Sequence, residues 1–318
     1  MASMPLCSRR LSGVLIGSAG IPALFAATAA VAAPLPLRFV LIPKLAHPWY
    51  DVVREGAEAA ANMIHQQTGA AAQVDYRPPA RSEVALQAAV LEAAIRSHPS
   101  GISIDLLDAE RLRPLLQKAQ REGISVNVFD SEPPAGLPLT SIGNDFCQQA
   151  RIASERLVQR LGGTGQVAIM QGVPTAPNHA IRVRCHRQVF ARYPGIRVVA
   201  SPIDQDSIAI AEQQALLTMR LHPQLRGWVV ADAGGGVGIG RAIQSLGRAG
   251  QVQVVALDDL PELLQLMRGG VVDSTAATKP RAQGYWSVLN LWQQGLNAPA
   301  IERIDTGISV RAGAAEPR

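Results

Sequence analysis

The sequence predicts an α/β protein made of two doubly wound parallel-sheet lobes joined by three hinge crossings. Short apolar runs rich in Val, Ile and Leu alternate with longer amphipathic segments along almost the whole chain. One apolar run occurs roughly every 25–30 residues, which is typical of strand–helix–strand units and parallel sheets. Ten or so strands are too many for one small domain, and no low-complexity linker divides the chain. We therefore expect lobes that exchange several strand crossings.

The first unit covers residues 38–61, and the rest of the chain is arranged around it. Phe39 to Ile42 form a short apolar run typical of a buried strand, and a helical pattern begins at Tyr50. Trp49 and Tyr50 lie between the two, at the carboxyl end of the strand, where open α/β sheets bind ligands. The alternative is that both rings only anchor the helix on the sheet.

The later units repeat this alternation. The predicted strands are 72–76, 101–106, 125–129, 140–143, 166–170, 197–200, 227–231, 252–257 and 273–278. Helices are expected over 82–97 and 108–122, and Asp145 is expected to cap the helix after the fourth of these strands.

The amino-terminal segment 1–32 has the pattern of a cleaved secretory signal peptide. Arg9 and Arg10 precede a weakly apolar stretch that ends in an Ala-x-Ala exit before Ala33. A membrane anchor is the alternative, but several Gly, Ser and Thr make the stretch a poor span. Arg9 and Arg10 also leave a twin-arginine export route open. We expect a soluble chain in the periplasm.

Composition excludes several classes of function. Without Arg9 and Arg10 the formal charge falls from +5 to +3, and no basic run of the nucleic-acid type occurs. Cys147 and Cys185 could form a disulfide in an oxidising compartment, although the sequence does not give their separation. No zinc-type spacing or nucleophile elbow is present, so we expect no metal, no cofactor and no catalytic residues.

Four carboxylates follow four predicted strands, at Asp105, Asp130, Asp232 and Asp258. In parallel sheets these positions face one crevice, although each residue could instead cap the next helix. Carboxylates accept hydrogen bonds from vicinal hydroxyls, and a ring such as Trp49 covers the C–H face of a sugar.

Two loops between strand and helix are further candidates. Asn178 and Arg182 are four residues apart and so share one helix face, although Arg182 could also be an ordinary surface arginine. The glycine-rich segment 234–240 lacks the Lys-Ser/Thr of a phosphate loop. We expect its glycines to admit a ligand or the neighbouring lobe.

The order of these features resembles the periplasmic sugar-binding proteins of the ribose/galactose type, which feed ABC importers, from about Leu37 to Val310. The resemblance rests on Ile42-Pro43-Lys44 with His47-Pro48-Trp49-Tyr50, Gly123–Val126 leading to Phe129-Asp130-Ser131, Ile142–Asp145, the Asn178/Arg182 pair, Tyr193–Ile196, His222-Pro223, Val254–Asp258 and Lys279-Pro280. It implies the type I periplasmic binding protein fold, which lactose-repressor effector domains share. The implied lobes are 34–142 plus 281–304 and 145–277 plus 308–318, with crossings near residues 142–145, 278–280 and 304–307.

Carried over by position, the family's ligand contacts fall on twelve residues. These are His47, Trp49, Tyr50, Asp105, Asp130, Ser131, Asn144, Arg182, Gln205, Asp232, Asp258 and Thr278. The chain departs from ribose binders at Ser131, where they have arginine, and at Gln205, where they have a second ring. Leu257 stands in place of another ring, Asp232 in place of an asparagine and Thr278 in place of a glutamine, so the implied cleft is acidic and stacks its ligand on one side.

The resemblance implies a monomeric solute-binding protein, not an enzyme, that captures a neutral monosaccharide or polyol for the membrane permease of an ABC importer. A periplasmic sensor component that reports to a receptor is the first alternative, because in both roles the membrane partner recognises the closed form of the same two lobes. A small cationic ligand is the second. A signal peptide stands where repressors have their DNA-reading domain, so no nucleic acid is expected.

Overall fold

The structure is a computed structural model that describes residues 36–313. The predicted signal peptide and the last five residues lie outside this range. Within the described range, no helix is long and apolar enough to cross a bilayer.

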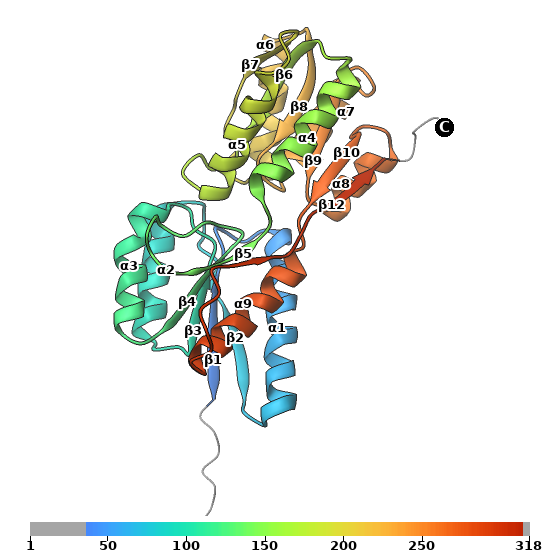
Figure 1. The fold of residues 1–318 in the computed structure, drawn as a ribbon. Coiled ribbons are helices and arrows are strands. Elements are labelled where there is room, and N and C mark those ends of the chain that lie inside the picture. Colours follow the sequence, from blue (N-terminus) through green and yellow to red (C-terminus); the bar gives the residue numbers. More distant parts are fainter. Residues whose placement is uncertain (1–35, 314–318) are drawn as a thin grey trace, which may run out of the picture. The chain divides into compact units, whose positions relative to one another are not determined.

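The first lobe is built on a six-stranded sheet in the order β11-β5-β4-β3-β1-β2, in which every pair is parallel (Figure 1). Its strands are β1 (Leu37–Ile42), β2 (Ala72–Tyr76), β3 (Gly101–Ile104), β4 (Ser125–Phe129), β5 (Thr140–Gly143) and β11 (Arg303–Asp305). Its helices are α1 (Pro48–Thr68), α2 (Val84–Arg96), α3 (Ala109–Arg121) and α9 (Pro280–Gly295). Alternate residues of β1 face opposite ways: Phe39 packs with α1, whereas Val40 packs with α2 and α3.

The second lobe has a six-stranded sheet in the order β12-β10-β9-β8-β6-β7. Its strands are β6 (Gly165–Met170), β7 (Ile196–Ala200), β8 (Leu225–Val230), β9 (Gln253–Leu257), β10 (Ser274–Ala277) and β12 (Ser309–Ala312). Its helices are α4 (Phe146–Leu161), α5 (Pro177–Phe190), α6 (Ile208–Leu221), α7 (Gly235–Ser245) and α8 (Pro261–Arg268). Every pair in this sheet is parallel except at one edge, where β12 runs antiparallel to β10.

The chain passes between the two sheets three times, after β5, after β10 and between β11 and β12 (Figure 1). The prediction of two doubly wound α/β lobes is thus confirmed. Asp145 caps α4 as expected, because its carboxylate accepts the backbone N–H of Gln148 at 2.8 Å.

Two glycines allow α1 and α9 to touch along their backbones. A Cβ added at Gly284 would lie 1.8 Å from the carbonyl oxygen of Val53, and one at Gly56 would lie 1.9 Å from that of Arg281. No side chain fits at such distances, so the close approach of these helices requires glycine at both positions.

The glycine-rich segment has the same function inside the second lobe. A Cβ at Gly238 would lie 2.5 Å from Ala211 of α6, and one at Gly236 would lie 2.7 Å from Ala256 of β9. These two glycines therefore let α7 pack tightly within its own lobe rather than admit a ligand. Only Gly234, whose added Cβ would be 3.5 Å from His47 Nε2, faces the other lobe.

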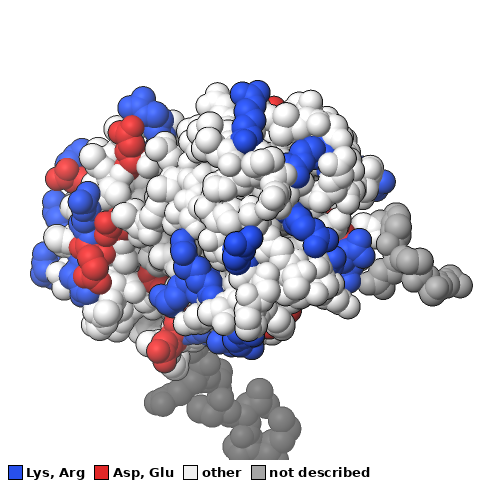
Figure 2. Space-filling model, turned by 90° about the horizontal axis from the view of Figure 1, so that it is seen from above, with Lys and Arg blue, Asp and Glu red and all other residues white. Residues whose placement is uncertain are grey.

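Figure 2 shows Lys and Arg side chains scattered among uncharged ones on the face viewed from above, without one continuous basic patch.

Candidate functional site

A small cavity lies at the carboxyl ends of the strands of both sheets, where the two lobes meet. Its volume is about 10 Å³, enough for roughly one water molecule. It is lined by Lys44, His47, Trp49, Tyr50, Asp130, His179, Arg182, Asp206, Asp232, Ala233 and Asp258. Side chains from both lobes line this small space, so the lobes are in a closed arrangement.

Seven of the twelve predicted residues line this cavity, namely His47, Trp49, Tyr50, Asp130, Arg182, Asp232 and Asp258. The other five, Asp105, Ser131, Asn144, Gln205 and Thr278, do not. Lys44, His179 and Asp206 line it and were not predicted.

Asp130 connects the lobes. It follows β4 with a φ of 40°, a left-handed conformation that few residues other than glycine adopt. Its carboxylate accepts hydrogen bonds from Asn178 Nδ2 at 2.6 Å and from the Arg182 guanidinium at 3.4 Å, both on α5 of the second lobe. Arg182 is therefore a buried group of the site and not a surface arginine.

Gln149 of α4 holds Arg182 in place. Its Oε1 accepts Arg182 Nε at 2.8 Å and Asn144 Nδ2 at 3.2 Å, while its Nε2 donates to the carbonyl of Ala276 at 2.8 Å. It thereby links α5, the segment after β5 and the end of β10. The predicted contact Asn144 lies behind Arg182 in this network, with its Oδ1 buried and without a partner in the described part of the chain.

Trp49 also bridges the lobes. Its indole Nε1 donates to Thr278 Oγ1 at 3.0 Å, and that hydroxyl donates to the carboxylate of Asp258. The backbone N–H of Thr278 donates to the same carboxylate at 3.0 Å. Burial raises the pKa of Asp258 to about 6, although the Arg182 charge and the Thr278 hydrogen bonds oppose this. Thr278 thus positions Trp49 and Asp258 and does not line the cavity.

Asp105 pairs within its own lobe. Its Oδ2 accepts Lys44 Nζ at 2.5 Å and the Tyr50 hydroxyl at 2.7 Å, and all three side chains are buried. Burial raises the pKa of Asp105 to about 7 even beside the Lys44 ammonium. Burial, together with the charge on Asp105, raises the pKa of Tyr50 well above its usual value.

Three aspartates form an acidic wall in the second lobe. Burial raises the pKa of Asp204 to about 6, and burial with the nearby Asp204 charge raises the pKa of Asp232 well above its usual value. Asp232 also accepts the backbone N–H of Gly235, at the start of α7, at 2.6 Å. Asp206, with a φ of 62°, completes the wall. The first lobe faces it with His47, whose buried Nε2 has no hydrogen-bond partner among residues 36–313.

Two predicted residues, Gln205 and Ser131, lie outside the cavity lining, whereas the unpredicted His179 is part of it. Gln205 contributes its carbonyl, which accepts Ser82 Oγ of the first lobe at 3.0 Å. Ser131 is buried and its hydroxyl has no partner within the described residues. His179 accepts the backbone N–H of Val173 at Nδ1, at 2.9 Å, and burial lowers its pKa well below its usual value, so its ring is neutral.

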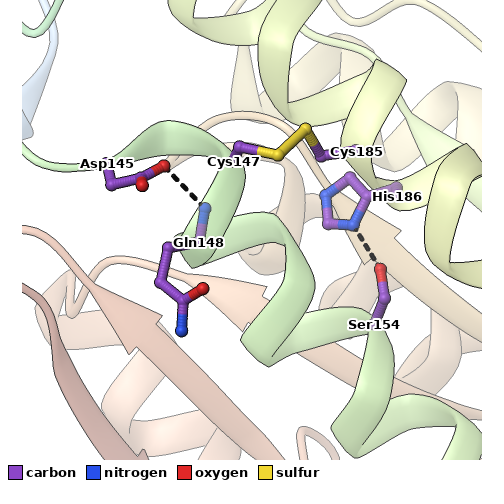
Figure 3. The surroundings of a disulfide bond; sticks show 6 residues. All are labelled: Asp145, Cys147, Gln148, Ser154, Cys185 and His186. Carbon is purple, nitrogen blue, oxygen red and sulfur yellow. Dashed lines mark hydrogen bonds between the residues drawn. A yellow bond between two sulfur atoms is a disulfide. The ribbon is translucent and has the colours of Figure 1, made fainter.

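A disulfide joins the two helices behind this site. Cys147 of α4 and Cys185 of α5 are bonded, with Cα atoms 5.4 Å apart (Figure 3). Next to it, Ser154 Oγ lies 2.7 Å from His186 Nδ1 (Figure 3). Both side chains are fully buried, and His186 Nε2 bonds the carbonyl of Val230 at 3.0 Å. Without access to solvent or to the cavity, this pair is structural.

The arrangement offers many hydrogen-bond acceptors and few free donors. Lys44 and Arg182 are both engaged by carboxylates, so they neutralise charge inside the protein. A molecule rich in hydroxyl donors would satisfy the acceptors, and Trp49 would cover an apolar face. No group of side chains suited to hold a metal ion occurs in the described range.

Comparisons with known proteins agree with this geometry. The family model described as periplasmic binding protein domain matches residues 38–297. The D-ribose/D-allose-binding protein of Pseudomonas aeruginosa is 26% identical over 309 residues, covering 90% of this chain and 92% of that protein. A solute-binding protein of Burkholderia graminis, solved with D-arabinose, is 27% identical with a TM-score of 0.80, covering 87% of this chain and 95% of that one. One from Agrobacterium vitis, solved with α-D-tagatopyranose, is 26% identical with a TM-score of 0.81 and the same coverage. The chain belongs to the periplasmic binding protein family.

Proposed function

We propose that this protein captures a neutral monosaccharide or polyol between its two lobes and delivers it to the membrane permease of an ABC importer. The observation that carries the proposal is the convergence of strand-end carboxylates and Trp49 from both lobes on one closed cavity. The ligand-contacting groups we assign are Trp49, Asp130, Asp232 and Asp258. Opening of the lobes would widen this space to admit a sugar, and closing would bring the ring and the acceptors onto it.

The charge of the site favours a neutral ligand over an anionic one. Asp130 and Asp105 each form an ion pair with a cation, whereas Asp206, Asp232 and Asp258 line the cavity and form no ion pair among residues 36–313. A sugar phosphate would meet these carboxylates while both cations that line the cavity, Lys44 and Arg182, are already paired. Hydroxyl donors would instead satisfy them.

The same acidic wall supports a second candidate, a small cationic ligand. Asp206 and Asp232 form no ion pair among the described residues, and an ammonium group beside them would favour the charged form of Asp232, whose pKa is raised by burial. This candidate predicts that an amine outcompetes a plain sugar.

Export to the periplasm remains part of the proposal. It rests on the amino-terminal pattern of segment 1–32 and on the Cys147–Cys185 disulfide, which is stable in oxidising compartments and rare in reducing ones. Amino-terminal sequencing of the mature protein should begin at or near Ala33, and a retained Met1 in the membrane fraction would contradict it. A sensor role would differ in the membrane partner. Purification of the closed protein with its partner would then recover a receptor in place of the permease.

Thermal-shift screening tests the ligand class. D-Ribose, D-allose, D-arabinose, D-tagatose and xylitol are compared with glucosamine, choline and ribose 5-phosphate. A ligand at a hundred times its Kd stabilises the folded state by about 2.7 kcal/mol, which is about 5 °C for a protein of this size. We expect such a shift from at least one neutral compound, and its loss in Asp258→Ala. Stabilisation by choline or the phosphate alone would overturn the neutral-sugar assignment.

A further inference from the structure

The disulfide joins α4 and α5 near the hinge. Cys147 is the second residue of α4, which begins directly after the first passage between the sheets, and Cys185 lies one turn beyond Arg182 on α5. Figure 3 shows the bond crossing from one helix to the other. It therefore fixes the distance between the two helices at the level of the binding site.

The two residues of α4 that contact Arg182 lie on either side of this bond in the sequence. Gln149 accepts Arg182 Nε at 2.8 Å, and the guanidinium carbon stands 4.9 Å from the centre of the Phe146 ring. The disulfide thus lies within one helical turn of both contacts. A shift of α5 away from α4 would break them together.

Arg182 has little else to hold it in its position. Its guanidinium donates to the carbonyl of Ala231 at 3.2 Å and reaches Asp130 of the first lobe at 3.4 Å, a long hydrogen bond that a small shift would abolish. The first turn of α5 has no side-chain cap, since Ala176 precedes it. The first turn is tied to the first lobe by the Asn178–Asp130 hydrogen bond, and farther along α5 is tied to α4 by the disulfide and by the contact between Ser154 and His186.

We propose that the Cys147–Cys185 disulfide is a positioning element for ligand binding, which holds α5 against α4 so that Arg182 reaches Asp130 across the cleft. The effect on affinity rests on the proposed sugar-binding function. The effect on Arg182 itself does not, because it is a property of the protein without ligand.

The first test follows the Arg182 Nε–H directly. Protein labelled with ¹⁵N-arginine gives a signal for this buried group, assigned by its absence in Arg182→Met, and its hydrogen exchange is measured by NMR without sugar. We expect the double variant Cys147→Ala/Cys185→Ala to exchange at least tenfold faster. Gln149→Met, which keeps the disulfide, should do the same. Val189→Ala, a cavity variant at a buried position of α5, serves as the control for lost stability alone and should change the rate less than threefold.

The second test measures Kd by calorimetry for the tightest of D-ribose, D-allose, D-arabinose, D-tagatose and xylitol. Removal of the disulfide should raise Kd about tenfold in the wild-type background and less than threefold in Arg182→Met, because the bond acts through that residue. An equal rise in both backgrounds, or unchanged Nε–H exchange, would overturn the positioning role. If no sugar binds but the exchange depends on the disulfide, the proposed function fails and the positioning role stands.

Discussion

Replacing Lys44 by Met tests the buried pair beneath the site. Lys44 is 1% exposed and Asp105 is fully buried, and their atoms are 2.5 Å apart, so the change leaves a carboxylate with the Tyr50 hydroxyl as its sole donor in the described structure. Removing one partner of a buried ion pair costs about 3–5 kcal/mol of the free energy of unfolding. We expect a loss of this size at pH 8, measured by urea unfolding.

The loss should depend on pH with a definite sign. The pKa of Asp105 is about 7 with Lys44 present, and without that cation it rises further. Above pH 7 the folded variant then keeps a proton that the unfolded chain has released, so its stability falls as pH rises. The difference from wild type should shrink by about 1.4 kcal/mol per unit from pH 9 to pH 7 and level off below, where both folded proteins are protonated.

The double variant Lys44→Met/Asp105→Asn is the control. Asparagine removes the charge that needed a partner, so at least half of the lost stability should return and the pH dependence should vanish. A loss that is independent of pH, or no recovery in the double variant, would show that Lys44 contributes through packing of its alkyl chain rather than through its charge.

Three further changes have expected results. Cys147→Ala/Cys185→Ala removes a bond between residues separated by 38 positions in the sequence, so chain entropy predicts that urea unfolding will show a loss of about 4 kcal/mol; a loss below about 1 kcal/mol would contradict this. Gly284→Ala places a methyl group 1.8 Å from the carbonyl oxygen of Val53 in α1 and should cost about 3 kcal/mol of the free energy of unfolding. Gly295→Ala in the same helix, with no atom within 4 Å of the added Cβ, should be neutral or slightly stabilising. Trp49→Phe keeps an aromatic ring but loses the indole N–H, so calorimetry should show a sugar affinity about fivefold lower than that of the wild type. Trp49→Ala removes the ring as well and should lower the affinity about a hundredfold. Equal losses in the two variants would mean that the ring does not stack on the sugar.

The alternation of apolar runs and amphipathic segments was sufficient to predict both lobes, because each buried parallel strand is a continuous apolar run in the sequence. Strand β12 has no such apolar run, and it was therefore not predicted. Its residues are largely exposed and it lies at a sheet edge, so it has no apolar run to reveal it.

The position of a residue relative to a strand was enough to predict several of the side chains that line the cavity. Asp130, Asp232 and Asp258 follow their strands and line the cavity, and Asp105 follows its strand too but turns to Lys44. Lysine is rarely buried, so nothing in the sequence distinguished Lys44 from a surface residue. In the sequence, Gln149 is one of several glutamines on an amphipathic helix. Its hydrogen bond to Arg182 depends on the packing of α4 against α5, which the sequence does not give. The disulfide depends on that same packing.

Helix α9 belongs to the first lobe but comes from the last fifth of the sequence. It packs against α1 on the face of the sheet that holds Phe39, more than two hundred residues earlier, and β11 adds the final strand still later. A ribosome, which releases the chain from its amino end, must deliver the second lobe as far as β10 before the first lobe can bury that face. Because β12 completes the second sheet later still, neither lobe can complete its sheet until nearly the whole chain has emerged, and a chain that ended before β11 would lack the last strand of both sheets.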